Sequence, residues 1–314
     1  MATEVVERLR IVVLAGGDSA EREISLQSGR NVTRALRAAG HRVRQVDNSS
    51  VPLAEVPWNR YDVCFLALHG GAGEDGHVQA ELEALGVSYT GSDPAACRLA
   101  MSKSASKERF YQFTVPTPDY VLAHASDEVE QLALKVAPLG YPLVIKPDGQ
   151  GSSLGVSIVE NPDELVAATF LSQRYEPYIV AERFVAGREF TVGVIDREPL
   201  PAIEILHDHE FFDYDAKYES LSTRYRLATQ LPQVTLDRIT HAAVAASEAL
   251  GTRGACRVDL RLDEQLNPWV LEVNTTPGMT EHSLLPMAAQ AAGMSLAELC
   301  ERMAQAALAA EVVA

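Results

Sequence analysis

The feature that most constrains this chain is a pair of strand-like segments near its carboxyl end. Residues 257–262 and 269–274 both alternate apolar with polar side chains, which is the period of a half-buried β-strand. The segment between them is polar and contains a proline, which favours a turn. A hairpin folded about Gln265 would bring Asp259 across from the neighbourhood of Glu272. Two carboxylates would then share one face of an antiparallel sheet.

Two further polar side chains belong to the same surface, because residues two apart on a strand point to one face. They are Asn274, two after Glu272, and Arg257, two before Asp259. Two carboxylates and an amide oxygen are hard ligands, a set suited to Mg²⁺ that bridges a substrate phosphate. A hairpin whose polar face is merely solvated explains the same alternation, so these strands alone leave both interpretations open.

Composition excludes several classes of protein. A length of 314 residues suggests two or three domains, and a net charge of −16 argues against a nucleic-acid-binding surface or a polybasic membrane surface. The start has no apolar signal segment, and no apolar run is long enough to span a bilayer, so we expect a cytoplasmic protein with no membrane partner. The cysteines are too widely spaced to indicate a zinc site or a disulfide framework: Cys64, Cys97, Cys256 and Cys300.

The N-terminal third alternates strand and helix patterns, which predicts a parallel sheet. We expect strands at 10–15, 43–46 and 61–68 and a helix at 21–39. Ligands of such sheets gather beyond the carboxyl ends of the strands, where Glu21 and His69 lie beside glycine-rich turns. Glu21 could instead only complement a helix dipole, and His69 could be a structural histidine. GxGxxG and GxxxxGK[ST] are both absent, which argues against a dehydrogenase and a P-loop enzyme.

The middle third predicts a phosphate-binding loop. A helical pattern at 94–111 carries Lys103, and an apolar strand ends at Lys146 just before the loop 148–155. The glycines of this loop free backbone amides to surround a phosphate, and Ser152 with Ser153 would add hydroxyl donors. A flexible hairpin tip is the alternative. Strands at 178–185 and 188–194 follow, with Glu182 and Glu189 on either side of their turn.

Five motifs in this order resemble the ATP-grasp ligases and, more narrowly, the D-alanine:D-alanine ligase family. They extend over the chain from Gly16 to about Met294, at 16–25, 67–76, 151–155, 212–218 and 272–286. The resemblance implies an α/β, three-domain ATP-grasp fold. Its parts would be an N-terminal parallel-sheet (Rossmann-like) domain, 1–96, and two α+β domains that sandwich ATP, 97–187 and 188–314. A helical segment from Ser283 to the end would pack back on the core.

For the nucleotide, the resemblance implies roles for nine positions beside the metal ligands. Lys103 and Lys146 would contact phosphates, Glu182 and Glu189 would hold the base and ribose, and Phe184 with Val185 would lie against adenine. Ser152, Ser153 and Lys217 would also line the ATP site. Two Mg²⁺ or Mn²⁺ ions would be held by Asp259, Glu272 and Asn274, in agreement with the strand geometry.

For the amino acids, the resemblance implies that Glu21 holds the ammonium of a first D-alanine. Ser152 and Tyr218 would be hydrogen-bonded to Glu21, and His69 would lie near the same substrate. Arg257 and the backbone amide of Gly278 would form an oxyanion site, and Lys217 with Ser283 would bind the carboxylate of a second D-alanine. The implied catalytic residues are Glu21, Ser152, Tyr218, Arg257 and Gly278. A loop at about 207–227 would close over the site.

The implied reaction is the ATP-dependent ligation of two D-alanine molecules through an acylphosphate, for peptidoglycan synthesis, by a homodimeric cytoplasmic enzyme. An ATP-grasp ligase that joins D-alanine to D-lactate or another amino acid is the alternative, although Tyr218 directly after Lys217 favours the dipeptide. A nucleotide-binding regulatory module without turnover is a third interpretation. The retained Lys146, Arg257 and metal ligands argue against it, since such a module needs no oxyanion donor.

Overall fold

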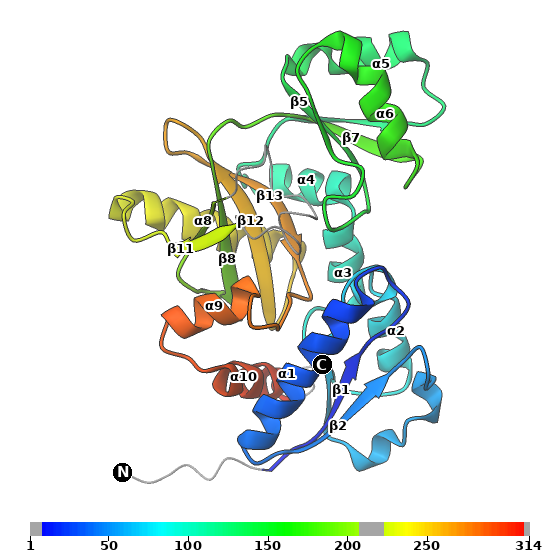
Figure 1. Cartoon of the computed structure of the whole chain (residues 1–314), viewed down its shortest axis with the longest axis vertical. Helices are drawn as coiled ribbons and strands as arrows, with labels where there is room; N and C mark the ends of the chain where they lie inside the picture. Colours follow the sequence, from blue (N-terminus) through cyan, green and yellow to red (C-terminus); the bar gives the residue numbers. More distant parts are fainter. Residues whose placement is uncertain (1–7, 207–222, 311–314) are drawn as a thin grey trace.

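The computed structural model describes residues 8–206 and 223–310, and Figure 1 shows them arranged around three sheets. An N-terminal sheet lies at the bottom of that view, a central sheet lies at the top, and the C-terminal sheet lies at mid-height. Short 3-10 turns lie at Leu53–Glu55, Trp58–Arg60, Gly71–Gly73, Ala137–Leu139 and Pro162–Glu164. Within the described residues, no helix has the length and apolar content needed to cross a bilayer.

The N-terminal sheet is parallel, as the sequence predicts. Its strand order is β2-β1-β3, with β1 at Arg10–Ala15, β2 at Arg42–Asp47 and β3 at Val63–Leu66. Residues 11–15 of β1 are fully buried, and alternate side chains enter two separate core clusters. The two faces are covered by α1 (Arg22–Ala38) and α2 (His77–Ala84). A parallel sheet buried on both faces explains the continuous apolar sequence of β1.

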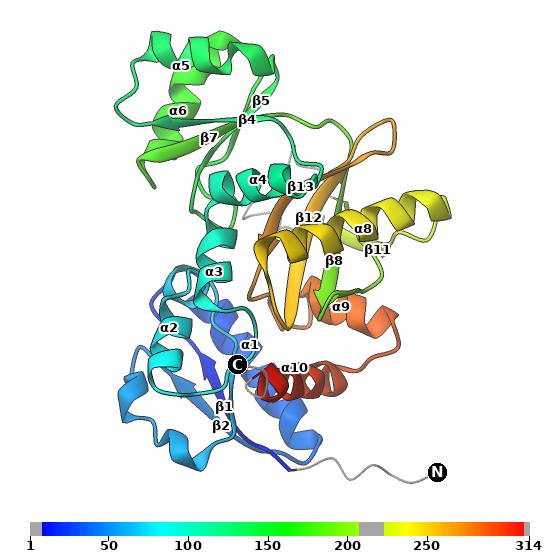
Figure 2. The same ribbon diagram turned by 180° about the vertical axis from the view of Figure 1, so that it is seen from behind.

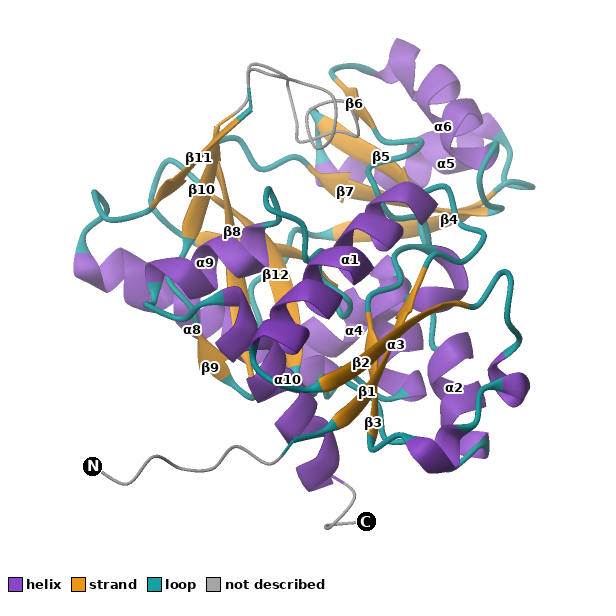
Figure 3. Cartoon of the chain, turned by 60° about the horizontal axis from the view of Figure 1, so that its bottom comes forward, coloured by secondary structure: helices purple, strands orange, loops and turns teal. Residues whose placement is uncertain are grey.

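Helix α1 lies between this sheet and α10 (Leu296–Ala310), as Figure 3 shows. Its buried positions include Ser25, Gly29, Val32 and Leu36, which recur at helical spacing. Gly29 is required for the close approach, because a Cβ there would overlap the Cβ of Ala15 on β1. The helix ends just before Gly40, as predicted.

The predicted helix 94–111 is two helices, and this part of the prediction is wrong. The helical conformation is interrupted at Ser102, between α3 (Pro94–Met101) and α4 (Lys103–Gln112). Ser102 accepts a hydrogen bond from the amide of Ala105 (3.2 Å). Asp148 from the predicted phosphate loop accepts from the amide of Ser104 at 2.7 Å, which completes the cap. The break places Lys103 at the first position of α4, beside that loop.

The central sheet is antiparallel and has the strand order β4-β7-β5-β6. The strands are β4 (Tyr120–His124), β5 (Leu143–Pro147), β6 (Ser157–Val159) and β7 (Tyr178–Arg183). Helices α5 (Val129–Val136) and α6 (Leu165–Gln173) share one core cluster with it. The predicted loop 148–155 joins β5 to β6, so it lies at one end of this sheet.

The C-terminal sheet is antiparallel and has the order β11-β10-β8-β12-β13, with β9 paired to β8. Its strands are β8 (Arg188–Ile195), β9 (Glu198–Pro199), β10 (Ile203–Leu206), β11 (Arg224–Leu227), β12 (Ala255–Leu262) and β13 (Pro268–Asn274). Helix α8 (Gln233–Leu250) packs on one face together with α4, which Figure 2 shows beside β13. The expected C-terminal helical segment is present as α9 (Leu284–Ala291) and α10. The domain boundaries drawn from sequence stay a prediction.

The predicted hairpin is confirmed, and it contains a β-bulge that the sequence did not predict. Asp259 and Glu272 are register partners, as are Arg257 and Asn274. The register shifts between Asp259 and Leu260, so that Leu271 is the extra residue on β13. Without the shift, Leu271 would face Asp259. The bulge therefore brings the two carboxylates opposite each other.

Candidate active site

The facing strands β12 and β13 carry the predicted metal-binding side chains. Arg257 holds Asp259 through three hydrogen bonds: Nε to Oδ1 at 2.9 Å, Nε to Oδ2 at 3.3 Å and Nη2 to Oδ2 at 2.7 Å. Thr191 on β8 donates to Asp259 Oδ1 at 2.6 Å. In residues 8–206 and 223–310, no three His, Cys, Asp or Glu side chains are grouped as a metal site. The predicted set has two carboxylates and the amide of Asn274, so a bound cation would draw further oxygen ligands from substrate or water.

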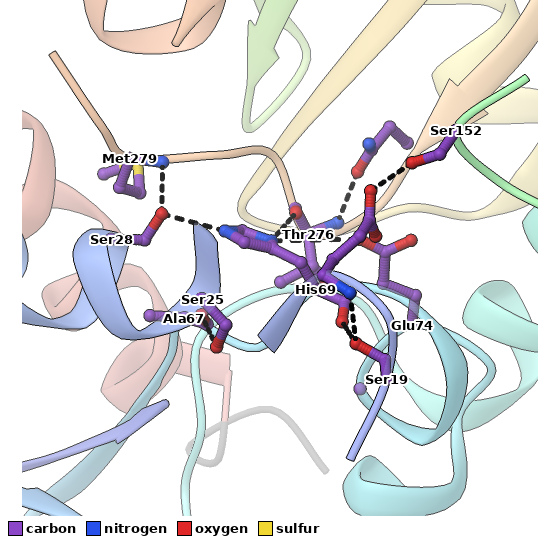
Figure 4. Close-up of polar contacts among 12 residues, drawn as sticks. Ser19, Ser25, Ser28, Ala67, His69, Glu74, Ser152, Thr276 and Met279 are labelled. Carbon is purple, nitrogen blue, oxygen red and sulfur yellow. Dashed lines mark hydrogen bonds and ion pairs between the residues drawn. The ribbon is translucent and has the colours of Figure 1, made fainter. Parts of the chain in front are cut away.

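A contact between the N-terminal part and the central loop closes one side of the site. Ser152 Oγ, on the loop between β5 and β6, donates a hydrogen bond to Glu21 Oε1 at the start of α1 (Figure 4). The Glu21 side chain makes no capping hydrogen bond to its own helix. Glu21 occupies the N-cap position, where its carboxylate complements the helix dipole, and it also lines the cavity.

His69 is part of a chain of hydrogen bonds that joins the N-terminal part to the segment after β13. Figure 4 shows its ring between Ser28 and Thr276: Nε2 lies 2.9 Å from Ser28 Oγ and Nδ1 lies 3.2 Å from the carbonyl oxygen of Thr276. Ser28 in turn accepts from the amide of Met279 at 3.1 Å. A neutral ring with its proton on Nδ1 satisfies all three bonds. Burial lowers the pKa of His69, which favours this neutral form.

Gly278 and Ser283 lie together on the segment that follows β13. A Cβ on Gly278 would come within 2.7 Å of Ser283 Oγ, so only glycine fits beside that hydroxyl without a shift. Ser283 Oγ accepts from the amide of Thr280 at 2.9 Å, which fixes its position. Both residues line the same cavity as Arg257.

A cavity of 260 Å³ collects most of the predicted amino-acid site. The predicted residues that line it are Glu21, His69, Lys103, Ser152, Arg257, Glu272, Asn274, Gly278 and Ser283. Lys217 and Tyr218 lie outside the described residues. The predicted closing loop, about 207–227, lies mostly outside them too, although its last four residues form β11.

Glu74 is a cavity residue to which the sequence analysis gave no role. It lies inside the 73–76 motif, and its Oε1 is 3.9 Å from His69 Nδ1. Burial and the nearby Glu21 carboxylate raise the pKa of Glu74 to about 8, so it is a neutral acid at pH 7. The only signal in the sequence was its place next to glycines at the end of a predicted strand.

A second cavity, of 100 Å³, collects the predicted nucleotide-binding residues. Its lining includes Lys103, Lys146, Ser153, Glu182, Phe184, Val185, Glu189, Asp259 and Glu272. Three residues line both cavities: Lys103, Gln150 and Glu272. The two cavities therefore meet at one lysine and one of the predicted metal ligands.

The lysines of the second cavity are buried. Lys103 donates from Nζ to the carbonyl oxygen of Gln150 at 2.6 Å, and burial lowers the pKa of Lys103 although Glu272 opposes the shift. Lys146 donates to Glu182 Oε1 at 2.6 Å. A lysine on a helix is usually solvated, but Lys103 is buried, because the break at Ser102 places it beside the loop.

Basic residues at or near this cavity that the sequence analysis did not single out include Lys107 and Arg261. Lys107 on α4 is fully buried and lies 2.9 Å from Glu182 Oε2. Arg261 on β12 lines the cavity with its guanidinium carbon 5.1 Å from the centre of the Phe184 ring. Arg261 follows Asp259 by two positions, so strand alternation could have found it. Lys107 follows Lys103 by four, one helical turn, but a helical lysine gave no reason to expect burial.

Comparison with known proteins adds independent findings. Residues 110–305 match the family model described as the D-ala D-ala ligase C-terminus, and residues 44–92 match the D-ala D-ala ligase N-terminus. The chain is 45% identical to the D-alanine:D-alanine ligase of Alkalilimnicola ehrlichii, over 94% of this chain and 93% of that protein. It is 42% identical to the ligase of the same name from Gloeobacter violaceus, over 94% and 98%.

Comparison with solved structures points to the same family as the sequence comparisons. The structure is similar to that of the Bacillus anthracis D-alanine:D-alanine ligase complexed with ATP, with a TM-score of 0.86 and 33% sequence identity over 97% of this chain and 99% of that one. The similarity extends over all three sheets and confirms the ATP-grasp α/β fold expected from the sequence.

The raised pKa of Glu74 predicts a pH dependence of stability. Because its pKa rises from 4.5 to about 8 on folding, the folded state keeps a proton that the unfolded chain releases between these values. The free energy of unfolding of the wild type, relative to that of Glu74→Gln, should therefore fall by roughly 2 to 4 kcal/mol as pH rises from 5 to 8. Urea denaturation at each pH measures this difference. The matched control is Glu81→Gln on the exposed face of α2, for which we expect no such trend. If the free energies of unfolding of the wild type and Glu74→Gln changed in parallel with pH, Glu74 would not be a neutral acid in the folded state.

Proposed function

This chain belongs to the D-alanine:D-alanine ligase family, and from that premise we propose that it joins two D-alanine molecules at the expense of ATP. The products are D-alanyl-D-alanine, ADP and phosphate, and the dipeptide supplies peptidoglycan synthesis. The carboxylate of the first D-alanine takes the γ-phosphoryl group of ATP, and the amine of the second then attacks the acylphosphate and expels phosphate.

The observation that carries this proposal is the junction of the two cavities. The reaction transfers a phosphoryl group from a nucleotide to an amino acid, so the two sites have to adjoin. Here they share Lys103 and Glu272 at their boundary. A cation beside the transferred group offsets the negative charge that gathers in the first step.

We propose that Asp259, Glu272 and Asn274 hold two Mg²⁺ or Mn²⁺ ions together with ATP. The fit rests on chemistry: the three side chains offer hard oxygen atoms, and the bulge sets both carboxylates on one face of the hairpin. Few protein ligands and several phosphate oxygens are the usual combination for Mg²⁺ beside nucleotides. When bound, such ions would supply positive charge to the phosphates.

In the amino-acid cavity, we propose that Glu21 holds the ammonium of the first D-alanine and that Ser152 keeps the Glu21 carboxylate in place. The second step develops an oxyanion as the amine attacks. Arg257 and the amide of Gly278, which line the same cavity, are suited to stabilise it. The carboxylate of the second D-alanine would be bound by Ser283 and Lys217.

The remaining nucleotide roles stay proposals of the same kind. Lys146 and Ser153 would contact phosphates, Glu182 and Glu189 would hold the base and ribose, and Phe184 with Val185 would lie against adenine. Because ATP is made in the cytoplasm, we place the enzyme there.

A direct assay tests the proposed function. ADP release is measured with Mg²⁺, ATP and D-alanine, then with L-alanine, and then with D-alanine plus D-lactate, and each product is identified by mass. We expect release that depends on D-alanine and yields its dipeptide. Release only when D-lactate is present would transfer the function to a depsipeptide-forming ligase. No release in any mixture would contradict the ligase activity.

Replacing Arg257 tests the oxyanion site. We expect Arg257→Ala to lower turnover by about 10² or more, the usual cost of one oxyanion donor. ADP binding is measured by calorimetry without added Mg²⁺ as a separate readout, because Arg257 does not line the nucleotide cavity but does hold Asp259, the proposed metal ligand. Arg253→Ala, an exposed arginine on the loop before β12, is the matched control and should keep full turnover. Near-normal turnover of Arg257→Ala would remove it from this role.

The family resemblance also implies a homodimer, which we propose for this chain. Light scattering of the purified protein should give a molar mass near twice that of the 34.1 kDa chain. A mass equal to one chain at micromolar concentration would contradict the dimer.

A further inference from the structure

Lys107 is a buried cation that the proposed reaction does not use. Its side chain has no exposure. Its ammonium donates hydrogen bonds to Thr117 Oγ1 at 2.8 Å and to the carbonyl oxygen of Pro118 at 3.0 Å, and it is ion-paired with Glu182 Oε2 at 2.9 Å. Two hydrogen bonds and one ion pair therefore restrain the ammonium from three directions. The ring of Tyr120 lies 5.7 Å away on another side. Lys107 is therefore fixed in place.

Thr117 anchors this arrangement to the hairpin of the catalytic sheet. Its hydroxyl accepts from Lys107 and donates to the carbonyl oxygen of Val270 on β13 at 2.8 Å. Three elements thus meet at one ammonium: α4, the segment before β4, and β7 through Glu182. Movement of the Lys107 side chain would break its contacts to the segment before β4 and to β7.

Lys146 holds the other oxygen of Glu182 but is placed differently. It lines the nucleotide cavity, which Lys107 does not, and within the described residues its Nζ has only the hydrogen bond to Glu182. Lys146 therefore keeps donors for the phosphates of a bound nucleotide. Once it turns to them, Lys107 is the cation that stays with Glu182.

We infer that Lys107 is a positioning residue that keeps Glu182 a fixed, ionised hydrogen-bond acceptor and thereby makes the nucleotide site select a purine with an amino group at position 6. This rests on the proposed function, in which Glu182 faces the base. An ionised carboxylate only accepts hydrogen bonds, so it pairs with the 6-amino group of adenine and repels the 6-oxo group of hypoxanthine. A protonated carboxyl donates and would tolerate the oxo group.

The electrostatics of the site agree with this assignment. Burial alone would raise the pKa of Glu182, but the ammonium groups of Lys107 and Lys146 outweigh burial and hold it below the usual range. Burial lowers the pKa of Lys107, an effect that Glu182 opposes, with smaller contributions from Lys146 and Asp119. Removing Lys107 would leave a buried carboxylate with one mobile partner, which favours its protonated form.

The experiment measures binding of ADP and of inosine diphosphate (IDP) by calorimetry, without D-alanine. We expect the wild type to prefer ADP, and Lys107→Met to lower the ratio of the two affinities by roughly tenfold or more. Lys107→Gln keeps donors for Thr117 and Pro118 and serves the same test if the Met variant does not fold. The matched control is Lys135→Met, an exposed lysine of the central part that pairs with Asp127 and should leave the ratio unchanged.

A double-mutant cycle separates this role from a general structural one. In Glu182→Gln the amide can donate to an oxo group, so the preference should already be lost. Adding Lys107→Met should then change the ratio no further. The inference would be overturned if both Lys107 variants kept the wild-type ratio of ADP to IDP affinity. It would also be overturned if Lys107→Met lowered that ratio as much in the Glu182→Gln variant as in the wild type. Because no D-alanine is present, a wild type that selects ADP but makes no dipeptide would contradict the proposed function and leave this inference standing.

Discussion

One extra residue on β13 determines the chemistry of the site. Leu271 and Glu272 are adjacent, yet both are half-buried on the side of the nucleotide cavity, which strict alternation forbids. The bulge allows it and turns Glu272 to face Asp259. A regular hairpin would put Leu271 opposite Asp259 and carry Glu272 to the other face. The predicted metal ligands and the place of Glu272 at the boundary between the two cavities depend on this local shift.

A second constraint is charge. The chain carries a net charge of −16, so its overall field repels the anionic nucleotide proposed as substrate. Lys103, Lys107 and Lys146 are buried around the nucleotide cavity or directly behind it, where a low dielectric strengthens each of them. Buried cations need acceptors, and here these are Glu182, Thr117 and two backbone carbonyl oxygens. Binding an anion thus depends on a few desolvated lysines and not on the surface.

Hydrophobic period and turn residues were enough to predict the local elements. The strand β1, the helix α1 and the hairpin of β12 with β13 came from hydrophobic patterning and from turn residues. The break at Ser102 did not, because it depends on Asp148, a residue 46 positions away. The bulge could not be predicted either, because a one-residue register shift is a property of two paired strands and does not change the residue pattern of one strand. Lys107 can be buried because its partners lie on two other segments, the one before β4 and β7. The composition of the chain does not indicate such contacts. The motifs supplied the residues of the cavities, and tertiary contacts supplied their arrangement.

Contacts of long sequence separation also explain why the site requires the whole chain. His69 reaches the carbonyl oxygen of Thr276 across 207 residues, and Ser28 reaches the amide of Met279 across 251. Glu21 and Ser152 join the N-terminal part to the central loop. Each contact is a hydrogen bond in or behind the cavity wall. Its contribution to the stability of the site depends on how well the surrounding packing excludes water. That packing is the core cluster shared by β1, α1 and the C-terminal helices α9 and α10. A loss of packing between α1 and α10 would therefore weaken the amino-acid cavity before it changed the nucleotide cavity, whose walls come from the central and C-terminal sheets.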